Sequence, residues 1–113
     1  MHEVLSELNR VSGVTGSMLV GNDGIVIAAD IDTSQEEDTV GALAASITAN
    51  IRKSLDRLET SPPQQVTIEA DESKLFFTDA GLGILVVSTA SEVNIGLVRL
   101  EIKNAISRLK MNR

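Results

Sequence analysis

Residues 14–28 read VTGSMLVGNDGIVIA, two apolar runs separated by a short polar segment. The polar segment GNDG, residues 21–24, contains residue types that tolerate positive φ angles, and tight turns need such angles. We therefore predict a strand over residues 18–20 and a return strand over residues 25–29. The two strands should pair as an antiparallel hairpin.

A short helix is predicted before this hairpin and a long helix after it. Gly13 is a typical C-terminal stop for the first. The sequence SQEE, residues 34–37, is a capping box that opens the second, predicted over residues 35–59. Pro62 and Pro63 end it, because proline cannot continue a helix. Apolar residues recur along both helices as on a buried helix face: Val4, Leu5, Leu8 and Val11 in the first, and Val40, Leu43, Ile47, Ile51, Leu55 and Leu58 in the second.

Three more strands and a last helix follow. Residues 66–70 alternate apolar and polar side chains, which indicates a half-buried strand. Residues 75–78 return the chain, and residues 84–87 are apolar on both faces, as expected of a central strand. Tight turns make these strands a meander. The last helix begins near Ser91, and its predicted buried stripe is Val98, Ile102, Ala105 and Leu109, widened by Leu97, Leu100 and Ile106.

Together these elements predict an α+β fold with the order αββαβββα and a five-stranded antiparallel sheet. The central strand needs cover on both faces, so helices should pack on both faces. The strands that flank the long helix should be the edges, and residues 66–70 form one of them. That edge has no proline or lysine guard, and an unguarded apolar edge tends to pair with another chain. Residues 1–113 should form one domain.

The long helix also presents a face of small side chains, which lets another backbone approach closely. Two interpretations are open. The small residues pack against the protein's own sheet, or they meet the same helix of a partner subunit. These residues are Gly41, Ala42, Ala45, Ser46 and Ala49.

Composition excludes several classes of function. The net charge is −6, and the only aromatic residues are Phe76 and Phe77, so nucleic-acid binding is not expected. The chain has no Cys and one histidine, His2. No metal site, cofactor or catalytic residue is predicted. The most apolar stretch, residues 84–87, is far shorter than the ~20 residues that span a bilayer, so we expect no membrane insertion and a cytoplasmic protein.

Two charged features have a plain interpretation. Asp30-Ile31-Asp32 after an apolar strand resembles the first motif of haloacid-dehalogenase phosphatases, in which carboxylates act as nucleophile and acid. Here the strand belongs to a hairpin, and acidic residues are common where a helix begins, so we assign both aspartates to a helix-entry loop. Basic residues concentrate near the end of the chain, from Arg99 to Arg113, where cations complement the dipole of a helix C-terminus.

Two stretches resemble the Roadblock, or dynein light-chain, family. They are residues 14–28, the hairpin with its Asp-Gly turn, and residues 94–102, NIGLVRLEI, at the entry to the last helix. The order of segments also matches that family throughout. Prokaryotic members are similar to partners of small Ras-like GTPases, and the nearest type is the regulator of the bacterial polarity and gliding-motility GTPase.

The resemblance implies a homodimer with a continuous sheet across its two-fold axis and two long helices side by side. The pairing strand would be residues 65–70, and the paired helix would be the one that contains Gly41 and Ala45. The implied dimer interface comprises Gly41, Ala42, Ala45, Ala49, Gln65, Val66, Thr67, Ile68 and Glu69. A GTPase partner would meet an acidic surface around the long helices, with Glu36, Glu37 and Asp38 near one end of each.

Two hypotheses for function follow. The first is a non-enzymatic, homodimeric regulator or scaffold for a small Ras-like GTPase. The second is a purely structural dimerisation module of a larger motor or signalling assembly. A small-molecule sensor is a third possibility, although no polar residues are predicted to converge on a pocket.

Overall fold

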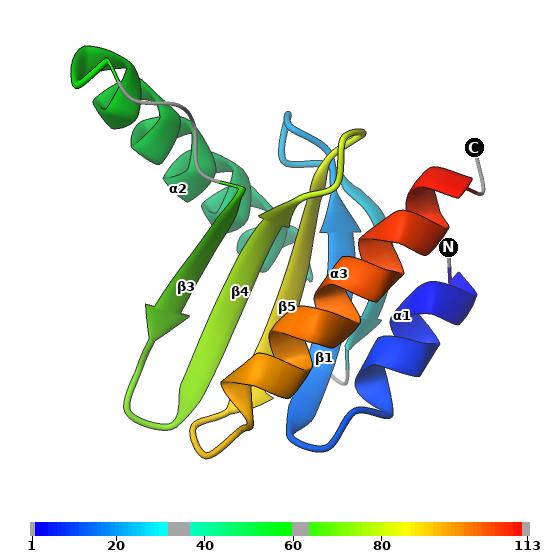
Figure 1. The fold of residues 1–113 in the computed structure, drawn as a ribbon. Coiled ribbons are helices and arrows are strands. Elements are labelled where there is room, and N and C mark those ends of the chain that lie inside the picture. Colours follow the sequence, from blue (N-terminus) through cyan, green and yellow to red (C-terminus); the bar gives the residue numbers. More distant parts are fainter. Residues whose placement is uncertain (1, 32–36, 60–63, 112–113) are drawn as a thin grey trace.

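The computed structural model describes residues 2–31, 37–59 and 64–111, which form three helices and five strands (Figure 1). In chain order these are α1 (His2–Asn9), β1 (Val14–Val20), β2 (Val26–Ile31), α2 (Glu37–Arg57), β3 (Gln65–Glu69), β4 (Ser73–Asp79), β5 (Ile84–Ala90) and α3 (Ile95–Met111). The predicted order αββαβββα is confirmed. The capping sequence at residues 34–36 and the prolines Pro62 and Pro63 lie outside the described residues.

The five strands form one sheet in the order β2-β1-β5-β4-β3, and every neighbouring pair is antiparallel. The predicted central strand is β5, and β2 and β3 are the edges, as expected for the strands that flank α2. Strand β1 begins at Val14, earlier than predicted, because its first residues also pair with the end of β5. Strand β3 is therefore an edge of the sheet, and the candidate site includes this edge.

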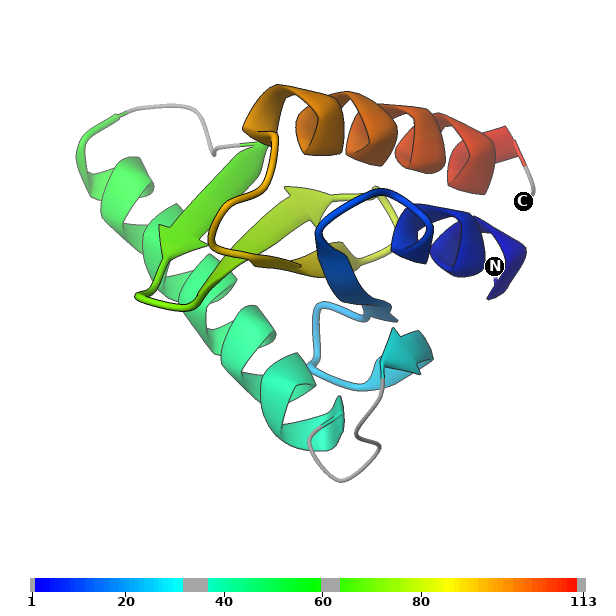
Figure 2. The ribbon, with the colours of Figure 1, turned by 90° about the horizontal axis from the view of Figure 1, so that it is seen from below.

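Helices cover both faces of the sheet, as predicted (Figure 2). Helices α1 and α3 pack on one face, where Leu5 and Ile102 meet Leu19, Phe76 and other buried residues of the strands. Helix α2 covers the other face. There Ala44 packs in a cluster that contains Met18, Val20, Phe77, Ile84 and Val86.

The hairpin between β1 and β2 forms at the predicted turn. The amide of Gly21 donates to the carbonyl oxygen of Ile25 at 2.8 Å, and the amide of Ile25 donates to Oδ1 of Asp23 at 3.0 Å. Gly24 has a φ of 87°, in the left-handed region that glycine adopts without strain. Asp23 and Gly24 are thus turn residues, and they fix the hairpin beneath α2.

Some residues predicted to lie in buried stripes are exposed instead. Leu43 of α2 is 55% exposed and Leu58, just beyond it, is 71% exposed. In α3 the stripe from Val98 to Leu109 is buried as predicted, but Leu97 and Leu100 are exposed. Each helix contacts the sheet with one narrow face, so a leucine one position to the side of the contact line remains in water. The predicted stripes were too wide for this packing.

Candidate functional site

Strand β3 presents an open backbone edge. The amide of Asp79 donates to the carbonyl oxygen of Gln64 at 3.0 Å, and the amide of Ala70 donates to the carbonyl oxygen of Ser73 at 2.9 Å. Backbone groups in an antiparallel pair alternate in direction, so the even-numbered residues of this stretch face β4. The odd-numbered residues Gln65, Thr67 and Glu69 therefore direct their N–H and C=O groups away from the sheet.

The side chains of β3 divide between the two faces of the sheet. Val66 and Ile68 are half-buried and pack against the cluster beneath α2. Gln65 is on the opposite face, where its amide donates to the hydroxyl of Thr78 at 3.1 Å. Glu69, at the end of the strand, is exposed. A strand added at this edge would thus extend an apolar surface on the α2 face.

The small residues of α2 do not all face the same way. Gly41 is buried, and a Cβ at this position would lie 3.1 Å from the carbonyl oxygen of Gly24 and 3.1 Å from a Val26 methyl group. Ala45 is half-buried and close to the same turn. The fold itself therefore uses Gly41 to let α2 approach the hairpin, as in the first of the two interpretations of the small-residue face.

The remaining small residues form an exposed stripe. Ala42, Ser46 and Ala49 are exposed and follow one another at spacings of four and three, so they lie on one side of α2. The first interpretation, packing within the chain's own fold, therefore holds for only part of the small-residue face. Gly41 and Ala45 pack against the chain's own hairpin, whereas Ala42, Ser46 and Ala49 are left accessible to another helix.

The C-terminal half of α2 crosses above the β3 side of the sheet. Ile51 and Leu55 are half-buried there, and Arg52 forms an ion pair with Asp79 of β4 at 3.7 Å. The hydroxyl of Thr48 is buried without a hydrogen-bond partner. A partner that packs against β3 would meet this half of α2 as well.

The acidic residues predicted to meet a GTPase are at the start of α2. Glu36 lies outside the described residues, and Glu37 and Asp38 are the first two residues of the helix, with side chains outside the described part. The assignment of Asp30 to a helix-entry loop was wrong, because Asp30 is an exposed residue of β2 whose carbonyl oxygen accepts a hydrogen bond from Asn9. Asp32 lies outside the described residues. Among described residues, no group of three or more His, Asp or Glu side chains is placed to hold a metal ion.

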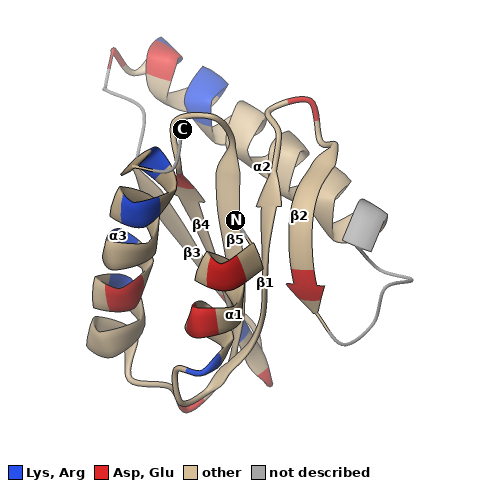
Figure 3. Cartoon of the chain, turned by 90° about the vertical axis from the view of Figure 1, so that its right-hand side faces the viewer, with Lys and Arg blue, Asp and Glu red and all other residues tan. Residues whose placement is uncertain are grey.

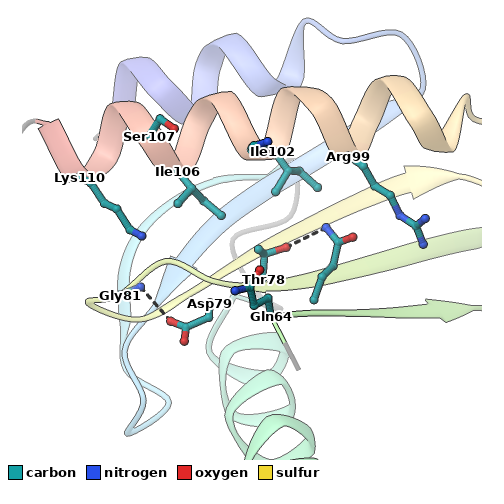
Figure 4. A pocket seen from close by; sticks show the side chains of 11 residues that line it. Gln64, Thr78, Asp79, Gly81, Arg99, Ile102, Ile106, Ser107 and Lys110 are labelled. Carbon is teal, nitrogen blue, oxygen red and sulfur yellow. Dashed lines mark hydrogen bonds between the residues drawn. The ribbon is translucent and has the colours of Figure 1, made fainter. Parts of the chain in front are cut away.

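On the other face of the sheet, a trough of about 580 Å³ runs between α3 and the β3–β4 side (Figure 4). Its α3 wall includes Arg99, Lys103 and Lys110, and its floor includes Ile102 and Ile106. Figure 3 shows the basic positions along α3, in contrast to the acidic positions on the neighbouring α1. No helix in the described part of the chain is both long enough and apolar enough to cross a membrane.

Comparison with known proteins identifies the fold. The profile of the Roadblock/LC7 domain matches residues 1–89. This chain belongs to the Roadblock/LC7 family. An uncharacterized protein of Methanocaldococcus jannaschii is 41% identical to this Roadblock domain over 107 residues, covering 95% of this chain and 91% of the relative.

Two solved structures share the fold of this Roadblock domain. The Roadblock/LC7 domain from Streptomyces avermitilis superposes with a TM-score of 0.92 at 24% identity, covering 99% of this chain and 96% of that one. MglB from Myxococcus xanthus superposes with a TM-score of 0.88 at 24% identity, covering 95% and 89%. The resemblance inferred from the hairpin and the last helix is thus confirmed at the level of family and fold.

The basic trough of this Roadblock domain was missed in the sequence. Arg99, Lys103 and Lys110 were assigned to the dipole of a helix C-terminus. Their spacing of four and seven positions, which places them on one helix face, was the available signal. What the spacing does not reveal is that this face overhangs the β3–β4 side of the sheet.

Proposed function

We propose that this Roadblock domain is a non-enzymatic, cytoplasmic homodimer that binds a small Ras-like GTPase as a regulator or scaffold and modulates its nucleotide cycle. Residues 1–113 act as one Roadblock-type domain in this proposal, which requires no cofactor and no nucleic acid. The observation that supports it most is the open edge of β3 beside the exposed stripe of α2.

The dimer is proposed to form by antiparallel pairing of two β3 strands about a two-fold axis at Thr67. In this register Thr67 pairs with its symmetry mate, and Gln65 pairs with Glu69 of the other copy. All three residues with outward backbone groups then have partners. If the two-fold axis passed through Glu69 instead of Thr67, the Glu69 residues of the two copies would lie opposite one another. Like charges directly opposite each other are destabilising.

On the α2 face, the same pairing brings Val66 and Ile68 of the two copies together and places the long helices side by side. Ala42, Ser46 and Ala49 permit close approach of the helix backbones. Closed two-fold dimers are the commonest oligomers, and such an interface is self-complementary. The interface of the proposal therefore comprises β3 and the exposed stripe of α2, with Gly41 and Ala45 supporting α2 from beneath.

A partner without catalytic groups can still alter a GTPase cycle. The chain has no Gly-rich turn leading into Lys and Ser or Thr, so we expect it neither to bind nor to hydrolyse GTP itself. It need only bind one arrangement of the switch loops of the GTPase more tightly than the other, because the population shift follows that difference in affinity. Glu36, Glu37 and Asp38 would steer a basic patch of the GTPase towards α2.

The test is the affinity of the chain for small Ras-like GTPases of the same organism, loaded with GDP or with a non-hydrolysable GTP analogue. We expect unequal affinities for the two forms and slower association as salt rises. The matched variants are Glu36→Gln/Glu37→Gln, which should slow association, and Asp71→Asn/Glu72→Gln, an equal charge change in the exposed β3–β4 turn, which should not. Equal affinities for both nucleotide forms would contradict a regulatory role and leave a structural dimerisation module as the remaining hypothesis.

A further inference from the structure

In the trough between α3 and the β3–β4 side, basic side chains of the described residues gather without acidic partners. Arg99, Lys103 and Lys110 are all exposed, and none forms an ion pair within the part of the chain that the structure describes. By contrast, Arg108, on another side of α3, pairs with Glu7 of α1. The chain as a whole has a net charge of −6, so three unpaired cations on one face make the surface charge locally positive.

Among the residues that the structure describes, one carboxylate lines the trough, and its charge is already engaged. Asp79 accepts a hydrogen bond from the amide of Gly81 at 2.8 Å and lies 3.7 Å from Arg52. Figure 4 shows Lys110 reaching towards the loop at Gly81 and Arg99 reaching towards the sheet. Arg99 and Lys110 thus point into the trough instead of being drawn away to acidic neighbours.

The size and lining of the trough indicate what it can hold. Arg99 and Lys110 are eleven positions apart, about 16 Å along a helix axis, which is too far for one phosphate group to contact both. Between them the floor has apolar surface from Ile106, while Gln64 and Thr78 on the opposite wall can form hydrogen bonds. A ligand that fits would have several negative charges spread along its length, with apolar and hydrogen-bonding groups between them.

We propose that the trough binds an acidic, amphipathic peptide segment of a partner protein. Its carboxylates would meet Arg99, Lys103 and Lys110, and its apolar side chains would cover Ile106. A peptide combines these groups, whereas a nucleic acid would have to approach an otherwise acidic protein that has no aromatic side chain in the trough. This site goes beyond the proposed GTPase surface and is on the opposite face of the sheet from α2, so either proposal can fail alone.

The test begins with selection of random 16-residue peptides displayed on phage against the full chain. Selected peptides are then synthesised with a fluorophore and titrated by anisotropy against three proteins. These are the wild type, the trough variant Arg99→Glu/Lys103→Glu, and the control variant Arg10→Glu/Arg57→Glu. The control has the same change in net charge on exposed residues outside the trough. Inorganic phosphate and a short single-stranded oligonucleotide are titrated as competitors.

We expect selected peptides that combine acidic and apolar residues, with affinity lowered at least about tenfold in the trough variant and unchanged in the control. Affinity should also fall as salt rises. Both variants should unfold at the wild-type temperature, because all four substituted residues are exposed. The proposal is overturned if no peptide is enriched, if the selected peptides are not acidic, or if the trough and control variants bind them equally. Competition by the oligonucleotide at lower concentrations than the unlabelled peptide would overturn it in favour of nucleic acid.

Discussion

Proline at position 67 should separate dimer formation from folding. The amide of Thr67 points away from β4, so Thr67→Pro removes no hydrogen bond within the chain. Proline is tolerated at positions of an edge strand whose amide faces outward. In the proposed dimer, however, the same amide donates to Thr67 of the other copy. The substitution should therefore leave the fold intact and remove the pair at the two-fold axis.

The expected loss of dimer stability in Thr67→Pro follows from the two-fold symmetry. Two Thr67 residues that face one another exchange two backbone hydrogen bonds, and each contributes about 1 kcal/mol net. Both copies carry the proline, so the dimer loses about 2 kcal/mol, which raises its dissociation constant about 30-fold. The free energy of unfolding of the monomer should change by less than about 1 kcal/mol.

Sedimentation equilibrium over a range of concentrations measures the dissociation constant, and urea unfolding of dilute protein measures monomer stability. Thr67→Ala keeps the amide and should dimerise like the wild type. Ile68→Pro removes an amide that faces β4 and should destabilise the monomer by about 3 kcal/mol or more. A Thr67→Pro dissociation constant within about threefold of the wild-type value would refute pairing at β3. Equal stability of the two proline variants would refute the alternation assigned to that strand.

Three further outcomes are expected. Ala49→Arg should raise the dimer dissociation constant at least tenfold in sedimentation equilibrium, because burying an unpaired charge costs several kcal/mol. The stability of the monomer should stay within about 0.5 kcal/mol of the wild-type value, since Ala49 is exposed. An unaltered dissociation constant would exclude this stripe of α2 from the interface. Gly83→Ala should destabilise the fold by about 1–3 kcal/mol in urea, because its Cβ would lie 2.4 Å from the carbonyl oxygen of Val20. Thr48→Val should increase stability by about 1 kcal/mol in the same assay, because it removes a buried hydroxyl that has no hydrogen-bond partner, and a loss of stability would contradict that reasoning.

Much of the fold was predictable because its determinants are local. The hairpin turn at Asp23 and Gly24 depends on backbone preferences of those residues, and the central position of β5 follows from apolar side chains on both its faces. The edge positions of β2 and β3 were predictable from connectivity, because these two strands are the ones that the long helix α2 connects across one face of the sheet. The stripe from Val98 to Leu109 was predictable for the same reason, because its period is that of a helix.

What was not predictable depends on how the elements are oriented in space. The helical period shows that α2 has an apolar side, but not how far around the helix the sheet reaches, and so Leu43 was misplaced. Gly41 and Ala49 are alike in sequence terms, and only the position of the hairpin beneath α2 distinguishes them. The trough likewise arises from the angle at which α3 passes over β4, which no local pattern records.

The pairing of β1 with β5 joins the β1–β2 hairpin to the other three strands of the sheet, with Ser17 opposite Val87. During synthesis, β1 and β2 can form their hairpin early, but β3 and β4 are attached to it through β5, which leaves the ribosome last of all the strands. A chain that stops before residue 84 therefore has no sheet to hold β3 in place. In the proposed dimer, self-association through β3 would then be possible only for chains in which β5 has already been synthesised, and incomplete chains would not join it.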